Sequence, residues 1–308
     1  MRATQFIAVD WGSTNFRAQL VGENGAAVDE YSEPAGITRI DRAGMIDVMA
    51  RLRRRWPEPA FILCSGMIGS NVGWLNAPYI ECPAKLETLG GELLDTSIGG
   101  VSCRIVPGLA CRDADGEPDV MRGEEVEIAG LSSLYPHLRR GEAVVGLPGT
   151  HTKWVKLVDG VVQSFFTSMS GEVFDRLSES GLLSSMIAGE AAAGDAFDRA
   201  ADQGAAAGRG LGRLLFGVRA KVVREWMPAS DAASYARGVL IGAEIADAVS
   251  VYPTLKTQSR TIIVGNSALC ALYARAMERQ GVRTEIANKS HAAAAGYCAL
   301  MEKILEMA

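Results

Sequence analysis

Residues 7–32, IAVDWGSTNFRAQLVGENGAAVDEYS, decide the fold of this chain. An apolar run ends in a carboxylate, Asp10, and a turn of small residues follows at 12–15. Apolar and polar side chains then alternate over 16–20, which predicts a second strand directly after the turn. Such a turn brings backbone N–H groups and an acid to one strand end. It therefore indicates a site for a nucleotide phosphate and its metal ion.

The hairpin that follows extends this pattern. Asn24-Gly25 is a strong signal for a two-residue hairpin turn, and residues 26–31 are expected to form a third strand. The predicted order is strand, glycine turn, strand, hairpin, strand. It differs from the strand, glycine loop and helix of a dinucleotide-binding fold or a P-loop.

Composition limits the class of protein. The chain has 308 residues with 48% hydrophobic content, so one large or two medium domains are expected. The net charge is −5, and the conspicuous basic run at 51–55 falls on a helical pattern, where it is expected to form a solvated face. Nucleic acid is therefore not expected as a partner.

Cysteine spacing and hydropathy exclude further classes. The six cysteines and three histidines show no spacing typical of a zinc site or a disulfide framework. The N-terminus enters a strand without a signal segment, and no apolar run is long enough to cross a bilayer. We therefore expect a cytoplasmic protein without a membrane partner. Its assembly state is open, with a homodimer as one option.

The rest of the chain alternates strands and helices. A helix is expected over 119–134, and a linker at 139–142 marks the domain boundary. Further helices are expected over 42–56, 86–94, 172–183, 191–207, 211–226, 230–251 and 268–280, and further strands over 60–64, 103–106, 143–147, 154–157, 161–167, 261–264 and 283–286. We predict an N-terminal domain over 1–140, a C-terminal domain over 141–290, and a final helix, 291–308, that could pack back on the first domain.

A three-stranded unit occurs twice in the sequence. In the first half, Gly12 leads through a strand to Val21 and a hairpin. In the second half, Gly149 leads through a strand to Val158, at the same spacing, and to the hairpin Asp159-Gly160. Two copies with facing glycine turns could hold a polyphosphate between them. The alternative is a chance recurrence, because β-hairpins are common.

Several segments together resemble a known family. They are AVDWGSTNFRA (8–18), GMIGSNVGW (66–74) with APY (77–79), VPGL (106–109), DVMRGEE (119–125), LPGTHTKWV (147–155) with MSGE (169–172), and LIGAE (240–244). Their order and spacing resemble the sugar-kinase/Hsp70/actin superfamily and, more narrowly, the 2-dehydro-3-deoxygalactonokinase (2-oxo-3-deoxygalactonate kinase) family. The resemblance covers nearly the whole chain. It implies an α/β fold of two ribonuclease-H-like (actin-like ATPase) domains around an inter-domain cleft that holds ATP and Mg²⁺.

The resemblance also implies a nucleotide site. It assigns the phosphates to Gly12, Ser13, Thr14, Asn15, Gly149, Thr150 and Lys153, and the adenosine to Gly265, Asn266 and Ser267. Small residues suit the close approach of phosphate oxygens. Lys153 is either a cation for the phosphates or a surface strand residue. The superfamily usually places two glycines beside the adenosine, whereas the segment VGNS at 264–267 contains one.

Three charged residues are candidates for the chemistry. Asp10 is expected, by the resemblance, to anchor Mg²⁺ through water, and the alternative is an acid that caps its own turn. Arg17 could offset charge on the transferring phosphoryl group, or be an exposed strand arginine. Glu124 is the expected acceptor of the hydroxyl proton, with Asp10 as its rival. Acids in a first helical turn are, however, favoured by the helix dipole alone.

The loop at 67–79 is expected to bind a small sugar acid. The residues assigned to this substrate are Gly69, Ser70, Asn71, Trp74, Tyr79, Arg122 and Glu172. Amides, hydroxyls and an aromatic wall suit a ligand with hydroxyls, a keto oxygen and a carboxylate. Arg122 is the expected cation for that carboxylate. Trp74 could equally be a core residue, and Glu172 a helix N-terminal acid.

The activity implied by the resemblance is transfer of the terminal phosphate of ATP to the 6-hydroxyl of 2-dehydro-3-deoxy-D-galactonate, in galactonate breakdown. Three alternatives remain open on the same fold. They are a kinase of another hexose or keto-deoxy sugar acid, a phosphohydrolase of the exopolyphosphatase type, and a non-enzymatic ATP-binding switch.

Overall fold

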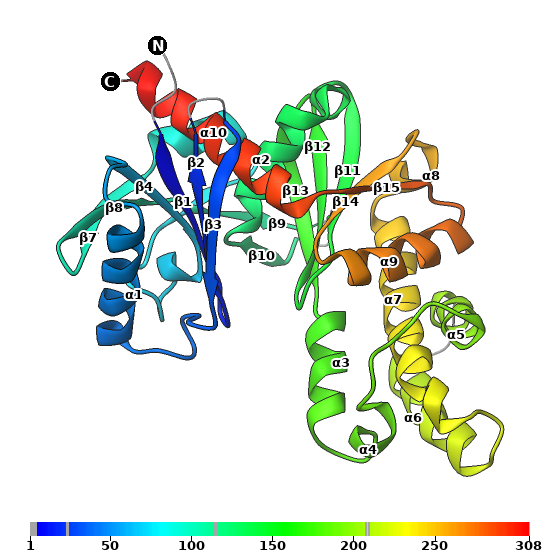
Figure 1. The fold of residues 1–308 in the computed structure, drawn as a ribbon. Coiled ribbons are helices and arrows are strands. Elements are labelled where there is room, and N and C mark those ends of the chain that lie inside the picture. Colours follow the sequence, from blue (N-terminus) through cyan, green and yellow to red (C-terminus); the bar gives the residue numbers. More distant parts are fainter. Residues whose placement is uncertain (1–4, 23–24, 114–115, 207, 209, 308) are drawn as a thin grey trace. The chain divides into compact units, whose positions relative to one another are not determined.

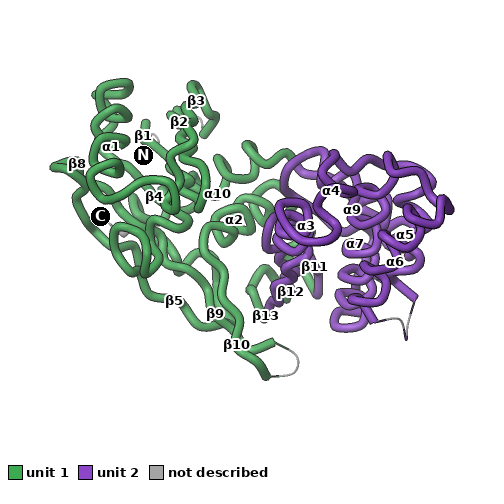
Figure 2. The backbone as a smooth tube through the Cα atoms, turned by 90° about the horizontal axis from the view of Figure 1, so that it is seen from below, with its two compact units in different colours: residues 1–141, 157–164, 288–308 green, residues 142–156, 165–287 purple. Residues whose placement is uncertain are grey.

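The computed structural model describes residues 5–22, 25–113, 116–206, 208 and 210–307 (Figure 1). The chain forms two compact units (Figure 2). Unit 1 consists of Met1–Gly141, Leu157–Ser164 and Asn288–Ala308, and unit 2 of Glu142–Lys156 and Phe165–Ala287. Within the described ranges, none of the helices has the length and apolar character needed to span a membrane.

Unit 1 is built on a six-stranded sheet in the order β3-β2-β1-β4-β8-β7. Its strands are β1 (Phe6–Trp11), β2 (Phe16–Val21), β3 (Ala27–Glu33), β4 (Phe61–Gly66), β7 (Leu94–Ile98) and β8 (Val101–Ile105). β1 pairs antiparallel with β2 and parallel with β4. The three strands predicted from the first stretch are thereby confirmed. Of the predicted hairpin turn, Asn24 lies outside the described residues.

Alternation in β1 directs one set of side chains into the core of unit 1. Ile7, Val9 and Trp11 are fully buried on the same strand face. The helix α1 (Arg42–Arg55) packs its apolar stripe into the same cluster; the buried residues of this stripe are Met45, Val48, Met49 and Leu52. Asp41 caps α1 by accepting a hydrogen bond from the Gly44 backbone N–H.

The segment between β4 and the next long helix forms a three-stranded sheet in the order β10-β9-β5. The strands of this sheet are β5 (Tyr79–Glu81), β9 (Gly108–Arg112) and β10 (Pro118–Met121). The same segment also contains β7, β8, the short strand β6 (Ala84–Lys85) and the 3₁₀ helices η1 (Met67–Gly69) and η2 (Leu86–Gly91). The helix predicted over 119–134 is wrong at its start, because Asp119 pairs with Cys111 of β9. The helix predicted over 86–94 is instead the shorter 3₁₀ helix η2, which β7 follows from Leu94.

Two helices that are far apart in the sequence pack against each other in unit 1. They are α2 (Glu124–Leu134) and α10 (Lys289–Met307), and η3 (Pro136–Arg139) follows α2 (Figure 1). A Cβ atom at Gly130 would lie 1.7 Å from the carbonyl oxygen of Ala292. A Cβ atom at Gly296 would lie 1.9 Å from that of Val126. The two glycines therefore permit a backbone contact that any side chain would prevent.

Unit 2 repeats the strand order of unit 1. Its strands are β11 (Glu142–Leu147), β12 (Thr152–Val158), β13 (Val161–Ser168), β14 (Thr261–Val264) and β15 (Thr284–Ala287). They run in the order β13-β12-β11-β14-β15, which matches β3-β2-β1-β4-β8. The ends of β12 and β13 at 157–164 cluster with unit 1, where Val161 and Val162 pair with β6. The predicted repeat of a three-stranded unit is confirmed at the level of strand order.

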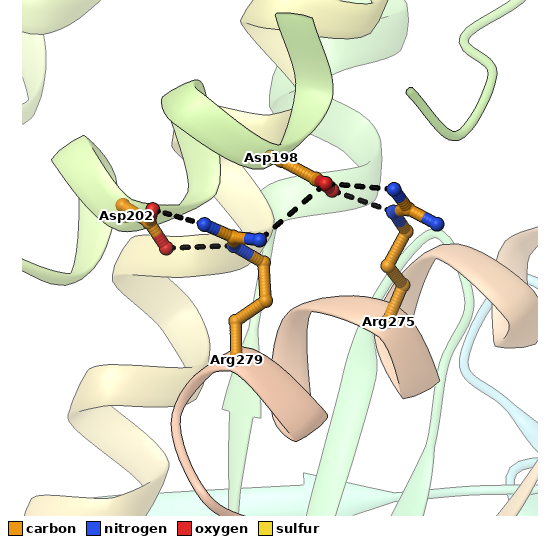
Figure 3. A network of polar contacts seen from close by, with 4 residues as sticks. All are labelled: Asp198, Asp202, Arg275 and Arg279. Carbon is orange, nitrogen blue, oxygen red and sulfur yellow. Dashed lines mark hydrogen bonds and ion pairs between the residues drawn. The ribbon is translucent and has the colours of Figure 1, made fainter. Parts of the chain in front are cut away.

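Helices make up the rest of unit 2. They are α3 (Ser170–Glu179), α4 (Ser184–Ile187), α5 (Asp195–Ala205), α6 (Leu211–Val223), η4 (Ala229–Asp231), α7 (Ala232–Val251), α8 (Thr254–Thr257) and α9 (Ser267–Arg279). Ion pairs fasten α5 to α9 (Figure 3). Arg275 donates to both carboxylate oxygens of Asp198 at 2.5 and 2.7 Å. Arg279 binds Asp202 in the same two-pronged way, a geometry that fixes orientation as well as distance.

Candidate active site

Asp10 lies near the end of β1 and faces Arg17 of β2. The two residues are register partners in the antiparallel pair, and Arg17 Nη1 lies 3.2 Å from Asp10 Oδ2. The side chain of Asp10 is 30% exposed and that of Arg17 is 52% exposed. Such an exposed ion pair contributes little to stability. It leaves an acid and a cation available to a ligand.

The turn at 12–15 presents free backbone donors. The Gly12 N–H closes the turn by donating to the Asn15 carbonyl oxygen at 3.0 Å. The carbonyl oxygens of the turn accept hydrogen bonds from the backbone of residues 36–38. Among the described residues, none accepts a hydrogen bond from the N–H groups of Ser13 and Thr14, which are both exposed. Free N–H groups beside small side chains suit an anion.

The start of α2 lies against the end of β4, close to Asp10. A Cβ atom at Gly123 would lie 3.3 Å from the Cα atom of Gly66, and one at Gly66 would lie 3.3 Å from Asp10 Oδ1. Both glycines have positive φ angles, 111° and 86°, which other residues rarely adopt. The glycine pair therefore brings the helix N-terminus and Glu124 next to the strand end that carries Asp10.

The two acids that begin α2 have different surroundings. Glu124 is partly exposed, and its Oε2 accepts a hydrogen bond from the Arg122 backbone N–H at 3.1 Å. Glu125 is fully buried, and its Oε2 accepts from the Gly123 N–H at 2.6 Å. Burial raises the pKa of Glu125 to about 8, with a smaller contribution from the charge of Glu124. Of the two, Glu124 is the acid that a substrate can reach.

Glu127 and Lys289 form an ion pair near the strand end that carries Asp10. Neither residue was predicted from the sequence. Lys289 is the first residue of α10, and its Nζ lies 3.0 Å from Glu127 Oε1. Glu127 follows Glu124 by three residues, so the two acids share one helix face. Burial raises the pKa of Glu127 to about 7, against the lowering effect of Lys289, and the charge of Asp10 raises it further. The helical spacing could have indicated Glu127, whereas no sequence signal points to Lys289.

The hydroxyl of Tyr297 joins α10 to the strand ends around Asp10. It donates to the Val9 carbonyl oxygen at 2.7 Å and lies 2.6 Å from Ser65 Oγ. Val9 precedes Asp10 in β1, and Ser65 is the register partner of Asp10 in β4. Tyr297 is buried. It therefore supports the backbone that carries Asp10, a contact that the sequence did not indicate.

Three of the residues assigned to the substrate meet in unit 1. The guanidinium carbon of Arg122 lies 4.3 Å from the ring centroid of Tyr79, and a Cβ atom at Gly69 would lie 2.9 Å from Arg122 Nη1. Arg122 Nη2 donates to the Ala77 carbonyl oxygen at 2.7 Å. Arg122 Nε and Nη1 are buried and have no hydrogen-bond partner among the described residues. Buried donors without a partner are costly, and each needs an explanation such as an anion site.

The other residues of the predicted substrate loop differ in exposure. Ser70 is buried, and its hydroxyl donates to the Met67 carbonyl oxygen at 2.7 Å. Asn71 is exposed. Trp74 packs against the core of unit 1, and the guanidinium of Arg42 lies 3.9 Å from the ring centroid. Trp74 therefore has a structural role, whatever it contributes to a ligand.

In unit 2, two loops and a helix start meet at Gly149. A Cβ atom at Gly171, in the first turn of α3, would lie 2.3 Å from the Gly149 carbonyl oxygen. The Glu172 N–H donates to the Thr150 carbonyl oxygen at 2.9 Å. A Cβ atom at Gly265 would lie 2.4 Å from the carbonyl oxygen of Pro148, which precedes Gly149. The predicted second phosphate turn and the predicted adenosine loop are thus neighbours.

The polar side chains of this turn are already engaged in unit 2. Lys153 is 6% exposed and donates to Thr167 Oγ1 at 2.6 Å, so it is not the surface residue that we considered. Glu172 Oε2 lies 2.6 Å from His151 Nε2, and this hydrogen bond lowers the pKa of Glu172. Asn266 caps α9 by accepting from the N–H groups of residues 268 and 269. Ser267 is the exposed first residue of α9.

A buried hydrogen-bond network lies beneath the Gly149 turn. Glu244 of α7 accepts hydrogen bonds from Trp154 Nε1 at 2.9 Å, from Tyr273 OH at 2.9 Å, and from Ser170 Oγ. Tyr273 OH also lies 2.9 Å from Thr152 Oγ1. Burial raises the pKa of Glu244, although these donors oppose the shift. The network links α3, α7 and α9 to the strand that leaves the turn, and Glu244 was indicated only as part of LIGAE.

The predicted residues thus form one cluster in each unit. Unit 1 holds the 12–15 turn, Asp10, Arg17 and Glu124, while unit 2 holds the 149–150 turn and Gly265. In the part of the chain that the structure describes, no group of three or more His, Cys, Asp or Glu side chains could hold a metal ion. Mg²⁺ needs no such group, because it keeps several waters and uses one or two carboxylates. The partly exposed Asp10 fits that requirement.

Comparison with known proteins gives a single result over nearly the whole chain. Residues 10–300 match the model of a family described as 2-keto-3-deoxy-galactonokinase. A Rhizobium meliloti (strain 1021) protein named "Probable 2-dehydro-3-deoxygalactonokinase" is 37% identical over 313 residues, which cover 98% of each chain. The 2-dehydro-3-deoxygalactonokinase of Escherichia coli (strain K12) is 34% identical over 278 residues, which cover 90% of each chain.

Solved structures give the same fold. A crystal structure of a Sinorhizobium meliloti protein that carries the provisional name 2-dehydro-3-deoxygalactonokinase has a TM-score of 0.86 and 35% identity, and covers 96% of this chain and 97% of its own. The predicted fold class, an α/β fold of the actin-like ATPase type, is confirmed. The predicted cleft and the roles of individual site residues stay predictions.

Proposed function

The chain belongs to the 2-keto-3-deoxy-galactonokinase family, and from this premise we propose that it transfers the terminal phosphate of ATP to the 6-hydroxyl of 2-dehydro-3-deoxy-D-galactonate. The observation that carries the proposal is the 34–37% identity to proteins with that named activity, over 90–98% of the chain. The proposed setting is galactonate breakdown in the cytoplasm.

At phosphorus, the reaction forms one bond and breaks one, and a proton moves from the hydroxyl to a base. The 6-oxygen of the sugar acid bonds to the γ-phosphorus, and the bond from that phosphorus to the β,γ-bridging oxygen breaks. ADP leaves with the electron pair, and the hydroxyl proton passes to a carboxylate. Glu124 is the proposed acceptor, because it is partly exposed at the helix start next to Asp10. Asp10 remains its rival.

Asp10 is also the proposed holder of Mg²⁺, through water. When bound, the ion would supply positive charge to the β- and γ-phosphates. Arg17, paired with Asp10 and half-exposed, would add a cation on the same edge. The free N–H groups of Ser13 and Thr14 would bind phosphate oxygens from unit 1. Gly149 and Thr150 would do so from unit 2.

The sugar acid is proposed to bind near Arg122. Arg122 Nε and Nη1 are buried and have no hydrogen-bond partner among the described residues, so either one could donate to an oxygen of a bound anion. Both nitrogens are out of contact with solvent, and Gly69 lies against one of them. A carboxylate can therefore reach them only if the loop at Gly69 moves. Tyr79 would provide an aromatic wall beside the same guanidinium.

A coupled assay of ADP release tests the proposed function. Purified protein with Mg²⁺–ATP is offered 2-dehydro-3-deoxy-D-galactonate, other keto-deoxy sugar acids, hexoses, or no acceptor. We expect ADP release that depends on the named acid, with a product phosphorylated at its 6-oxygen by phosphorus NMR. Release that is equal with and without any sugar would indicate a phosphohydrolase. Binding of ATP without turnover on any acceptor would indicate a switch protein.

A further inference from the structure

We propose that Lys289 is a further catalytic residue, whose ammonium contacts the phosphoryl group as it moves from ATP to the sugar acid. This inference rests on the proposed function and assigns a new residue to that site. Lys289 comes from the last helix of the chain, whereas Asp10 and Arg17 come from its first two strands. The structure brings all three into unit 1.

A buried acid, Glu127, fixes the position of the Lys289 ammonium. Its Nζ lies 3.0 Å from Glu127 Oε1, and only 12% of the Glu127 side chain is exposed. Glu127 stands one turn after Glu124, the proposed proton acceptor, on the same face of α2. A buried acid therefore holds the lysine beside the helix start where the proton transfer is proposed.

The helix that carries Lys289 cannot slide freely. Gly130 and Gly296 let α2 and α10 touch through their backbones. A Cβ atom would lie 1.7 Å from a carbonyl oxygen of the other helix at Gly130, and 1.9 Å at Gly296. Two turns after Lys289, the Tyr297 hydroxyl binds the Val9 carbonyl oxygen at 2.7 Å. These contacts set the distance of Lys289 from the strand end that carries Asp10.

Lys289 also keeps a free side. Its side chain is 43% exposed, although its ammonium binds Glu127. An ammonium has three donors, so one contact with Glu127 leaves capacity for phosphate oxygens. The charge of Glu127 raises the pKa of Lys289, and Asp10 adds to this to a smaller extent, while partial burial and, more weakly, the charge of Arg17 lower it. The net direction is upward, so the side chain stays protonated at neutral pH.

The excess of negative charge at the proposed site calls for a second cation, which Lys289 would provide. The proposed edge contains the acids Asp10, Glu124 and Glu127, and a nucleotide would add a strongly negative triphosphate. Of the cations, Arg17 already pairs with Asp10. A second cation would offset the charge that spreads over the phosphoryl oxygens while the bond to ADP breaks and the bond to the sugar oxygen forms. Lys289 keeps its own proton throughout and acts through its charge.

Lys289 could instead have a purely structural role, and that alternative predicts a different outcome for a double variant. If Lys289 serves only to neutralise buried Glu127, removing both charges together should restore activity. If Lys289 contacts the phosphoryl group, the double variant should stay slow. The pair Lys289→Met and Glu127→Gln therefore separates the two roles. Lys289→Arg, which keeps the charge, should recover part of the loss.

The test compares K289M, K289R and the E127Q/K289M double variant with the wild type, using sugar-acid-dependent ADP release. We expect kcat to fall at least about a hundredfold in K289M, the size of loss seen when one transition-state donor is removed. The double variant should fall as far, and K289R should lie between. ADP affinity by calorimetry should change little, while affinity for ADP with aluminium fluoride, which mimics the transferring group, should fall with kcat.

Lys303→Met is the matched control. Lys303 lies on the same helix, is similarly exposed at 41%, and pairs with Glu306. It should keep wild-type kcat. Near-normal kcat in K289M, or recovery in E127Q/K289M, would overturn the proposal while leaving the kinase intact. If K289M fails to fold because Glu127 is left unpaired, the double variant alone decides. Absence of sugar-acid-dependent turnover in the wild type would instead reject the proposed function.

Discussion

The carboxylate of Asp10 is paired with Arg17 and is still 30% exposed at the end of a strand whose apolar residues are fully buried. Because this exposed ion pair contributes little to stability, a change at Asp10 should affect activity more than folding. We therefore expect Asp10→Asn to lower kcat at least about a hundredfold, as for loss of a group that organises charge in the transition state. ADP binding without Mg²⁺ should survive.

The assay for this variant is sugar-acid-dependent ADP release at several Mg²⁺ concentrations, with ADP affinity measured in parallel. Asp95→Asn is a suitable control, because Asp95 is 80% exposed on β7, at the far edge of the same sheet. Turnover of D10N close to that of the wild type would mean that Asp10 does not hold the metal.

Glu125 predicts how stability depends on pH. Its ordinary pKa is 4.5, and burial raises the pKa in the folded chain to about 8. Between these values the unfolded chain releases the proton while the folded chain keeps it, so the free energy of unfolding falls as pH rises. Glu125→Gln keeps an acceptor for the Gly123 N–H and removes the titration. The variant should therefore gain on the wild type from pH 5 to pH 8, by up to several kcal/mol at about 1.4 kcal/mol per pKa unit.

Urea unfolding of both proteins at pH 5, 6, 7 and 8 measures this difference. Glu127 titrates in both proteins, so its effect cancels in the comparison. A constant difference across the pH range would show that Glu125 is already ionised in the folded chain.

Single residues show where sequence reasoning stops. Asp10 and Glu124 were indicated because each sits at a local signal, a strand end and a helix start. Lys289 and Tyr297 were not, because their partners are Glu127 and Val9, and only the packing of α10 on α2 brings these pairs together. Side chains whose role depends on a distant partner leave no pattern in their own neighbourhood.

At the scale of elements, the strands were predicted better than the helix ends. Alternation in β1 and β2 reflects a sheet with one buried face, so the pattern and the structure have the same cause. The start of α2 was misplaced because residues 119–121 form hydrogen bonds with β9 in a sheet that no local pattern indicated. The turn at Gly123, with a φ angle of 111°, then delays the helix.

The contact between α2 and α10 gives a stability prediction for Gly130. A methyl group there would lie 1.7 Å from a backbone oxygen of α10, so the helices must separate. We expect Gly130→Ala to lower the free energy of unfolding by about 1–3 kcal/mol or more, as overpacking does. Gly212→Ala is the control, because its Cβ would meet nothing within 4 Å in α6. There the gain in helix propensity should stabilise by roughly 0.5–1 kcal/mol. Urea unfolding measures both, and a stable G130A protein would contradict the close packing.

At the scale of the molecule, the sequence indicated the repeat and the option that the final helix packs back on the first domain, but nothing in it indicated that residues 157–164 belong to unit 1. Each copy of the three-stranded unit is local, so its spacing survives in the chain. Unit 1, however, also contains residues 157–164 and 288–308. These segments join it through contacts such as Val161 with Lys85 and Gly296 with Val126, which are remote in sequence. Contacts between residues so far apart in the chain depend on the complete fold and leave no local sequence pattern.

The two phosphate turns give the prediction that involves both units. Among the described residues, none accepts a hydrogen bond from the backbone N–H groups of Ser13 and Thr14, or from those of Thr150 and His151. Without nucleotide, these four amides should exchange their hydrogens rapidly. If one triphosphate is held by both turns, a non-hydrolysable ATP analogue with Mg²⁺ should slow exchange in the peptides that contain 12–15 and 149–152 together.

Hydrogen exchange followed by mass spectrometry, with and without the analogue, measures this protection. The β7–β8 hairpin at 94–105 is an internal control, because it contains none of the predicted nucleotide residues. Both turns should reach half protection at the same analogue concentration, because one bound molecule protects both. Protection of one turn alone would mean that the two glycine turns do not share a ligand, and the repeated unit would then be a feature of the fold without a role in binding the triphosphate.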